Sequence, residues 1–131
     1  MGVTYLLDTH VLLWLLGSPE RVPDPVRSPL AHPTNTLLVS AASAMEISTK
    51  TRIGKLPDVG LLDSWERRIA DIQGTGLPIT ANHALLAGGM KWDHRDPFDR
   101  LLAAQAIVEG AILVTVDPAF RRLPAPRLLT W

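Results

Sequence analysis

Short apolar segments alternate with segments of helical periodicity along this chain of 131 residues. Three apolar runs of strand length predict buried strands, and they span residues 3–7, 36–40 and 111–116. Helices are expected between them, and the connections are short. This alternation is typical of an α/β fold with a central, mostly parallel sheet and helices on both faces. A chain of this length fits a single domain, which we expect to span residues 1–131.

The remaining elements are predicted from periodicity and from proline and glycine positions. Residues 21–33 contain four prolines and are expected to support only short helical turns. Pro78 would confine a short strand at 77–79 to a sheet edge, and residues 127–130 could add a last strand. Helices are predicted for residues 9–16, 43–52, 61–72, 80–88 and 97–109.

Composition excludes several classes of protein. The chain has no Cys, so it holds neither a disulfide framework, a thiolate metal site nor a cysteine nucleophile. Thirteen Lys and Arg balance thirteen Asp and Glu, which argues against a generic basic nucleic-acid binder. No apolar run approaches the roughly 18 residues that a membrane span needs, so we expect no membrane partner and a cytoplasmic location.

Four carboxylates are expected near the edge of the sheet at which such folds bind ligands. Asp8 directly follows the first predicted strand, and Asp117 directly follows the last clear one. Glu46 lies about one turn into the helix after the second strand, and Asp99 lies in the first turn of the helix that precedes the last strand. Ligands of open parallel sheets bind beyond the carboxyl ends of the strands. We therefore expect these four acids to meet at one edge.

A cluster of carboxylates predicts a divalent cation, because each charge opposes ionisation of its neighbours. Oxygen ligands without Cys favour Mg²⁺ or Mn²⁺, with one or two ions per site. Such ions promote phosphodiester hydrolysis by activating water and stabilising negative charge. Metal-dependent hydrolysis of a phosphodiester is therefore the predicted chemistry.

Each acid also has a purely structural interpretation. Ser43 and Glu46 have the spacing of a capping box, and Glu46 could also pair with Lys50 one turn later. Asp96 before a proline is typical of a helix N-cap. Asp99 would then interact favourably with the helix dipole.

Two further interpretations stay open. The strand-end acids, Asp8 and Asp117, could form turns. The four histidines show no ligand spacing, and we expect only His94 near the cleft.

Four segments resemble the PIN-domain family and, within it, the VapC-type toxins of toxin–antitoxin pairs. They are YLLDTHVLLW at 5–14, VSAASAMEI at 39–47, HRDPFDRLLAAQA at 94–106 and LVTVD at 113–117, joined by GKL at 54–56. The resemblance covers nearly the whole chain. It implies that Asp8, Glu46, Asp99 and Asp117 form the catalytic, metal-binding acid set.

The resemblance also implies an activity and supporting residues. It implies an endoribonuclease that hydrolyses RNA with Mg²⁺ or Mn²⁺ and water as the nucleophile. Thr115 matches a small hydroxyl residue that could hold a water or a carboxylate, and Asp96 matches a recurrent acid. Basic residues near the acids are candidate phosphate contacts: Lys50, Arg52, Lys55, Arg95, Arg100, Arg121 and Arg122. The sequence departs from the family pattern at Met45 and Val116.

The implied partners are a second copy of the chain and a cognate VapB-type antitoxin that covers the active-site groove. DNA would be contacted only indirectly, through the antitoxin. One alternative is a binding module of the same fold that lacks catalysis and acts through its partner. A phosphatase or phospho-acceptor domain is a third interpretation, but His10 stands where such a phosphatase needs a second Asp.

Overall fold

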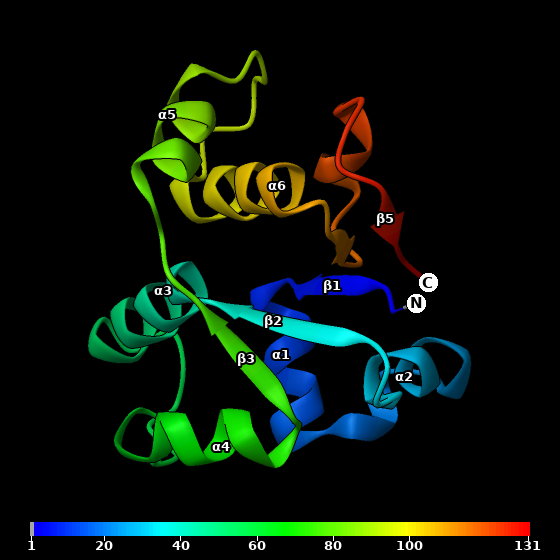
Figure 1. The fold of residues 1–131 in the computed structure, drawn as a ribbon. Helices are drawn as coiled ribbons and strands as arrows, with labels where there is room; N and C mark the ends of the chain where they lie inside the picture. The colour runs from blue at the N-terminus through cyan, green and yellow to red at the C-terminus, as the bar shows by residue number, and fades with distance from the viewer. Residues whose placement is uncertain (1) are drawn as a thin grey trace.

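The computed structural model describes residues 2–131 and contains one sheet of five parallel strands. The strands are β1 (Thr4–Leu7), β2 (Thr36–Ser40), β3 (Gly74–Leu77), β4 (Ile112–Val114) and β5 (Leu128–Leu129). Their order is β3-β2-β1-β4-β5. The chain moves outward from β1 to β3 and then returns to the other side of β1 (Figure 1). The border between β1 and β4 is therefore the switch in strand order where ligands of such sheets bind.

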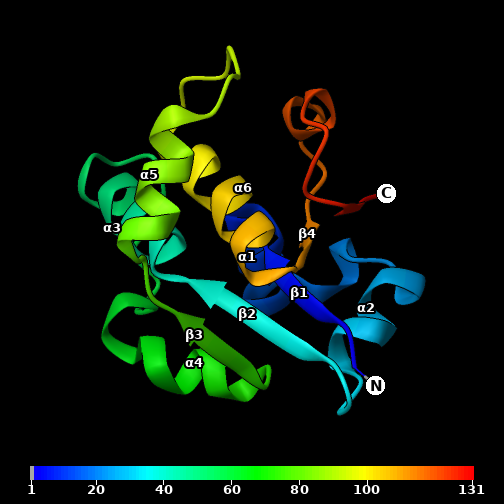
Figure 2. The same cartoon turned by 45° about the horizontal axis from the view of Figure 1, so that its top comes forward.

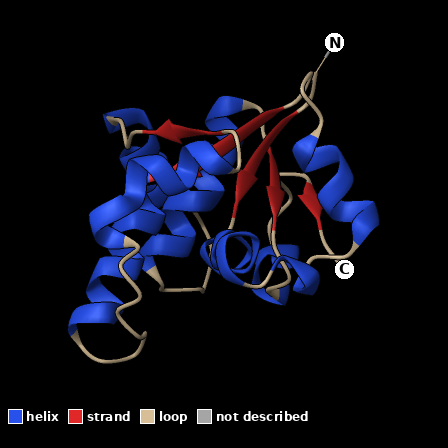
Figure 3. Ribbon diagram, turned by 90° about the horizontal axis from the view of Figure 1, so that it is seen from below, coloured by secondary structure: helices blue, strands red, loops and turns tan. Residues whose placement is uncertain are grey.

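Helices cover both faces of this sheet (Figure 3), which confirms the predicted α/β fold. The helices are α1 (Thr9–Gly17), α2 (Asp24–Ala31), α3 (Ala41–Arg52), α4 (Trp65–Asp71), α5 (Ala81–Gly89) and α6 (Pro97–Glu109). Three 3₁₀ turns accompany them: η1 (Pro19–Arg21), η2 (Leu62–Ser64) and η3 (Pro118–Arg122). Helices α1, α2 and α4 pack below the sheet as drawn, and α5 and α6 pack above it (Figures 1 and 2).

The two-residue periodicity of the strands divides the core into two layers. Leu6 pairs in register with Leu38 and Leu113, and all three face α6, where Leu102 is fully buried among them. The alternate strand residues face the opposite layer, which is built on α1, α2 and α4. They are Tyr5, Leu7, Leu37, Val39 and Val114. Both faces being apolar explains why these strands appear in the sequence as continuous hydrophobic runs.

The two helices that carry predicted site residues are capped by their own sequence. The Asp96 carboxylate accepts the backbone N–H groups of Phe98 and Asp99, and Pro97 occupies the first helical position of α6. Gly110 ends α6 in the left-handed conformation, with φ of 63°. The Ser40 hydroxyl caps α3 by accepting the Ala42 N–H. These caps fix where both helices begin at the carboxyl end of the sheet.

Three elements differ from the sequence expectation. Residues 24–31 form an eight-residue helix rather than only short helical turns. Pro25 lies in its first turn, where no N–H is needed, and Pro29 lies inside the helix. The edge strand spans 74–77 and ends before Pro78, so the two glycines expected to stop a helix belong to β3. Gly74 fits there because a Cβ would lie 3.0 Å from the Ile69 side chain. Residues 61–72, expected to form one helix, divide into η2 and the shorter α4. The predicted last strand does form, at residues 128–129.

None of the helices within residues 2–131 combines the length and the apolar character needed to cross a bilayer.

Candidate active site

Asp8 lies at the switch between β1 and β4, directly after β1. Its side chain is buried, and its Oδ2 accepts the Thr115 hydroxyl at 2.6 Å. The same hydroxyl oxygen accepts the backbone N–H of Asp117 at 3.0 Å. Burial raises the pKa of Asp8, and the Thr115 hydrogen bond opposes that rise by favouring the charged form. Thr115 thus holds the Asp8 carboxylate directly.

Glu46 faces the same edge from α3 and is also buried. Its Oε2 accepts the Lys50 ammonium at 2.7 Å, whereas its Oε1 is buried without a hydrogen-bond partner among residues 2–131. The capping-box interpretation is wrong, because Ser40 caps α3 and Ser43 instead hydrogen-bonds Thr9 at 2.9 Å. That contact joins α3 to the residue after Asp8.

Asp99 is held in the first turn of α6. Its Oδ2 lies 2.7 Å from the Nε2 of His94, and the Asp96 cap accepts its backbone N–H. Burial raises the pKa of Asp99 to about 6, and the charges of Asp96 and Asp8 add to the rise while the His94 hydrogen bond opposes it. The structure therefore shows Asp96 acting as a cap and places His94 in contact with Asp99.

The charges of these groups affect one another's pKa values. The Asp8 charge raises the pKa of Asp99, and the Glu46 charge raises that of Asp8. The Lys50 pKa is raised by its hydrogen bond to Glu46 and by the charges of Asp96 and Asp99. Only three groups, however, bring ligand atoms within 4.8 Å of one another among residues 2–131: His94, Asp96 and Asp99. The four predicted acids border one edge without forming such a compact set.

Asp117 stands at the outer margin of this edge. Its Oδ1 accepts the Ala119 N–H at 2.9 Å and so caps η3, as the turn-forming interpretation expects. It also lines a hollow of about 340 Å³ together with His94 and Arg122. Asp117 is therefore joined to Asp8 through Thr115 and not by direct contact of the two carboxylates.

Arg100 was predicted to contact phosphate, but in the structure it binds backbone carbonyls. Its guanidinium donates hydrogen bonds to four backbone carbonyls in the segment before α6, those of Ala87, Met90, Trp92 and His94. Four of its five N–H groups are thereby used. The structure assigns Arg100 to holding this segment, which carries His94, against the start of α6.

Sequence reasoning missed two polar contacts that position the site. Gln105 of α6 accepts the Ser40 hydroxyl and donates to the Pro78 carbonyl at 3.3 Å, so it joins α6 to the start of α3. The Thr9–Ser43 pair joins α1 to α3. A polar residue at an apolar helix position, as at Gln105, is the one signal that could have indicated such a contact.

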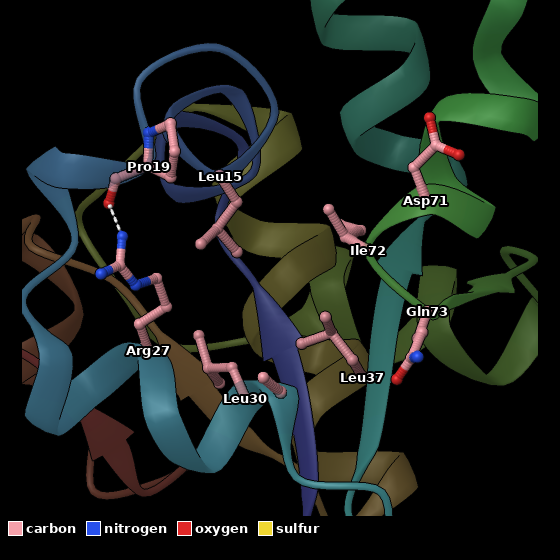
Figure 4. A pocket seen from close by; sticks show the side chains of 9 residues that line it. Leu15, Pro19, Arg27, Leu30, Leu37, Asp71, Ile72 and Gln73 are labelled. Atoms are coloured by element: carbon pink, nitrogen blue, oxygen red, sulfur yellow. Dashed lines mark hydrogen bonds between the residues drawn. The ribbon is translucent and has the colours of Figure 1, made fainter.

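A separate cavity lies at the opposite end of the strands. It measures about 330 Å³ and is lined by Leu15, Leu30, Leu37 and Ile72 among others (Figure 4). The Arg27 guanidinium at its rim donates to the Pro19 carbonyl at 2.9 Å. This largely apolar cavity is remote from the acids, so it does not contribute to their chemistry.

The acid set fits a divalent cation. Its ligand atoms are carboxylate oxygens, two of the carboxyl pKa values are raised, and one buried carboxylate oxygen has no donor within residues 2–131. A cation at this edge would lower the cost of these charges. The residues that could hold it are Asp8, Glu46, Asp99 and Asp117.

Comparisons with known proteins identify the family to which the chain belongs. A family model described as PIN domain matches residues 5–126. Ribonuclease VapC22 of Mycobacterium tuberculosis is 31% identical over 128 residues, covering 97% of each chain. VapBC2 from Rickettsia felis, solved bound to a promoter DNA fragment, superposes with a TM-score of 0.69 at 20% identity, covering 98% of this chain and 99% of that one. DNA-bound VapBC from Salmonella typhimurium gives a TM-score of 0.68 at 18% identity and 98% coverage of both chains. The chain therefore belongs to the PIN-domain family.

Proposed function

We propose that this chain is the toxin of a toxin–antitoxin pair, a metal-dependent endoribonuclease that hydrolyses RNA phosphodiester bonds. The observation that carries the proposal is the acid set at the switch point of the sheet, with Asp8, Glu46 and Asp99 buried. The chain is 31% identical to a protein named a ribonuclease. Oxygen ligands at this edge suit Mg²⁺ or Mn²⁺. Bound there, the ion would activate a water and stabilise charge on the phosphate.

The protein's own residues have distinct parts in this proposal. Asp8, Glu46 and Asp99 hold the cation, with Asp117 completing the set directly or through water. Thr115 orients the Asp8 carboxylate and favours its charged form through its 2.6 Å hydrogen bond. Lys50 neutralises one oxygen of Glu46, so the partnerless oxygen is the one free to coordinate. Arg95 and Arg121, both exposed near the acids, are candidate contacts for the RNA backbone.

The test is cleavage of a panel of structured and unstructured RNAs by purified, antitoxin-free protein. Cleavage is expected with Mg²⁺ or Mn²⁺ and is expected to stop on chelation. Asp8→Asn and Asp99→Asn should each abolish it without loss of the folded circular-dichroism spectrum. Asp63→Asn, at an exposed position on η2, is the matched control and should cleave normally. Cleavage that survives Asp99→Asn would contradict the proposal, and inactive protein with all ions would favour the binding-module alternative.

A VapB-type antitoxin and a second copy of the chain are the proposed partners. Two of the solved proteins of the same fold are VapBC assemblies bound to DNA, which supports an antitoxin partner. Exposed apolar side chains such as Met45 and Leu85 offer contact surface. A cytoplasmic location follows from an RNA substrate. Co-expression with a candidate VapB-type antitoxin, followed by size-exclusion chromatography, tests the complex and its stoichiometry.

A further inference from the structure

Three aromatic rings and one guanidinium gather where α1 meets the segment that follows β5. They belong to His10 and Trp14 of α1, Trp131 after β5 and Arg21 of η1. We propose that this aromatic group binds an unpaired base of single-stranded RNA by stacking, beside the acid set. The inference rests on the proposed function for its substrate, and it adds which part of the RNA is bound and where.

The aromatic group lies at the carboxyl edge of the sheet. One row across β1, β4 and β5 consists of Leu7, Val114 and Leu129. His10 and Trp131 each follow this row within three residues, at the side of the sheet to which the central strands point (Figure 3). The Thr115 N–H donates to the Leu129 carbonyl at 3.1 Å, and the Thr115 hydroxyl holds Asp8. The group is therefore a neighbour of the acid set.

The rings are tilted against one another and are not stacked. The ring centroids of Trp14 and Trp131 lie 6.1 Å apart at an interplanar angle of 61°, and those of His10 and Trp14 lie 6.4 Å apart at 49°. Trp131 is 39% exposed, whereas Trp14 packs partly against the core. Among residues 2–131 no parallel ring covers Trp131. Trp14 thus anchors the group, and Trp131 offers aromatic surface to a ligand.

Arg21 supplies the positive charge of the aromatic group. Its guanidinium carbon lies 5.0 Å from the centroid of the Trp14 ring. Arg21 is exposed, and its side chain makes no hydrogen bond or ion pair among residues 2–131. Its N–H groups are therefore available to a phosphate. A free cation beside exposed rings suits a nucleotide better than it suits a purely apolar segment of a protein.

Stacking is the contact that such a group can make with RNA. Unpaired bases stack on aromatic side chains and on guanidinium planes, while basic groups follow the phosphate backbone. Every base has a flat π face, so stacking tolerates all four bases. The aromatic group therefore accounts for holding an unpaired strand next to the acids, and it leaves the choice of sequence to other contacts.

RNA binding by full-length protein tests the proposal when cleavage is prevented. Asp8→Asn protein in Mg²⁺ serves as the parent, and anisotropy of a labelled oligouridylate of about eight nucleotides measures affinity. An abasic oligomer of equal length carries the same charge without bases. The oligouridylate is expected to bind at least about tenfold more tightly than the abasic oligomer. It should also quench tryptophan emission.

Variants of the aromatic group separate stacking from charge. In the Asp8→Asn parent, Trp131→Leu keeps apolar bulk and should weaken oligouridylate binding at least about tenfold, whereas Trp131→Phe should keep most of the affinity. Arg21→Gln should weaken binding of both oligomers, because it removes a phosphate contact. Trp65→Phe is the matched control, since Trp65 lies on α4 against the core, and it should bind as the parent does.

Several results would overturn the proposal. They are equal affinity for the oligouridylate and the abasic oligomer, binding of neither, and equal oligouridylate affinity of Trp131→Leu and its parent. Loss of antitoxin binding in Trp131→Leu with RNA binding unchanged would assign this surface to the antitoxin instead. RNA cleavage is measured separately, with wild-type protein in Mg²⁺. Base-dependent binding through Trp131 in a protein that cleaves no RNA would contradict the proposed function and leave this inference intact.

Discussion

Thr115 lowers the energetic cost of burying the Asp8 carboxylate. The Asp8 carboxylate is almost fully removed from water, and burial alone favours its protonated form. A hydroxyl at 2.6 Å donates to the charged form and partly offsets that cost. A threonine two residues before Asp117 thus supports an acid that lies more than a hundred residues away in the sequence.

Replacing Thr115 with Val should therefore destabilise the protein at neutral pH. The side-chain shape is kept, but Asp8 loses its donor and remains buried, which costs about 1–3 kcal/mol. Urea denaturation at pH 7.5 measures the loss, and Thr115→Ser should restore most of it. Thr75→Val, at an exposed position on the edge strand, should leave the free energy of unfolding almost unchanged. Equal stability of Thr115→Val and wild type would show that the hydroxyl does not support Asp8.

The raised pKa of Asp99 predicts how stability and ion binding depend on pH. Its folded pKa of about 6 exceeds the ordinary 3.8, so the folded state holds the proton more tightly. The stabilisation is complete below about pH 3.8 and is lost as the pH rises through about 6. Asp99→Asn should raise the free energy of unfolding of metal-free protein at pH 7.5 by about 1–2 kcal/mol.

Mg²⁺ should stabilise the folded protein more as the pH rises, because it competes with the proton on Asp99. Its effect on the melting temperature of wild-type protein should be small at pH 5 and larger at pH 7.5. Thermal melts with and without Mg²⁺ at both pH values measure this. The same melts on Asp99→Asn should show a smaller Mg²⁺ effect at pH 7.5. An Mg²⁺ effect that is equal at pH 5 and 7.5 would contradict the assignment.

The positions of the acids could be predicted from the sequence, whereas their contacts could not. Asp8 and Asp117 follow apolar runs, so the strand pattern alone locates them. The contact between His94 and Asp99 depends on how the segment before α6 folds back, and no periodicity records that. The Ser43 contact with Thr9 likewise depends on where α3 begins, which the capping-box spacing predicts incorrectly.

At the scale of elements, the segment from α5 to α6 is held by one arginine. Arg100 donates to four backbone carbonyls, and those groups would otherwise face water or remain unpaired. The fork geometry of a guanidinium suits several acceptors at once, and an ammonium cannot reproduce it. The segment that carries His94 is therefore expected to be ordered chiefly through this side chain.

Arg100→Lys keeps the charge and removes most of these hydrogen bonds. We expect the free energy of unfolding to fall by about 1–3 kcal/mol and amide hydrogen exchange to accelerate across residues 90–96. Arg95→Lys is the matched control, because Arg95 is exposed and makes no side-chain hydrogen bond among residues 2–131. Exchange at 90–96 that is unchanged in Arg100→Lys would show that this segment is ordered by other contacts.

The elements that depend on a clear pattern were predicted well, and those with mixed signals were not. Helix α6 is marked at both ends by Asp96, Pro97 and Gly110, and it forms as expected. Proline density argued against a helix at α2, but Pro25 lies in its first turn, where a proline costs little, and the helix also accommodates Pro29. The glycines of β3 suggested the end of a helix and not a strand. Gly74 is needed because Ile69 approaches it closely, and this tertiary contact cannot be inferred from the sequence.

At the scale of the whole molecule, charge and topology place the site. Without the four candidate metal ligands, nine acidic side chains stand against thirteen basic ones. The formal net charge of zero therefore combines an acidic edge with a mildly basic remainder of the protein. The order β3-β2-β1-β4-β5 puts the switch beside Asp8. Alternation of elements predicts a parallel sheet but not this order, because the side to which β4 returns depends on the packing of α5 and α6.

The central claim is that this acid edge cuts RNA, and RNA end mapping after a brief pulse of expression tests it most directly. Wild-type protein is expected to generate new RNA 5′ ends at a recurrent sequence or stem-loop within minutes. Asp8→Asn, expressed at the same level, should generate none, and co-expression of the antitoxin should suppress the wild-type ends. New ends that appear equally with wild type and Asp8→Asn, or with neither, would contradict the account.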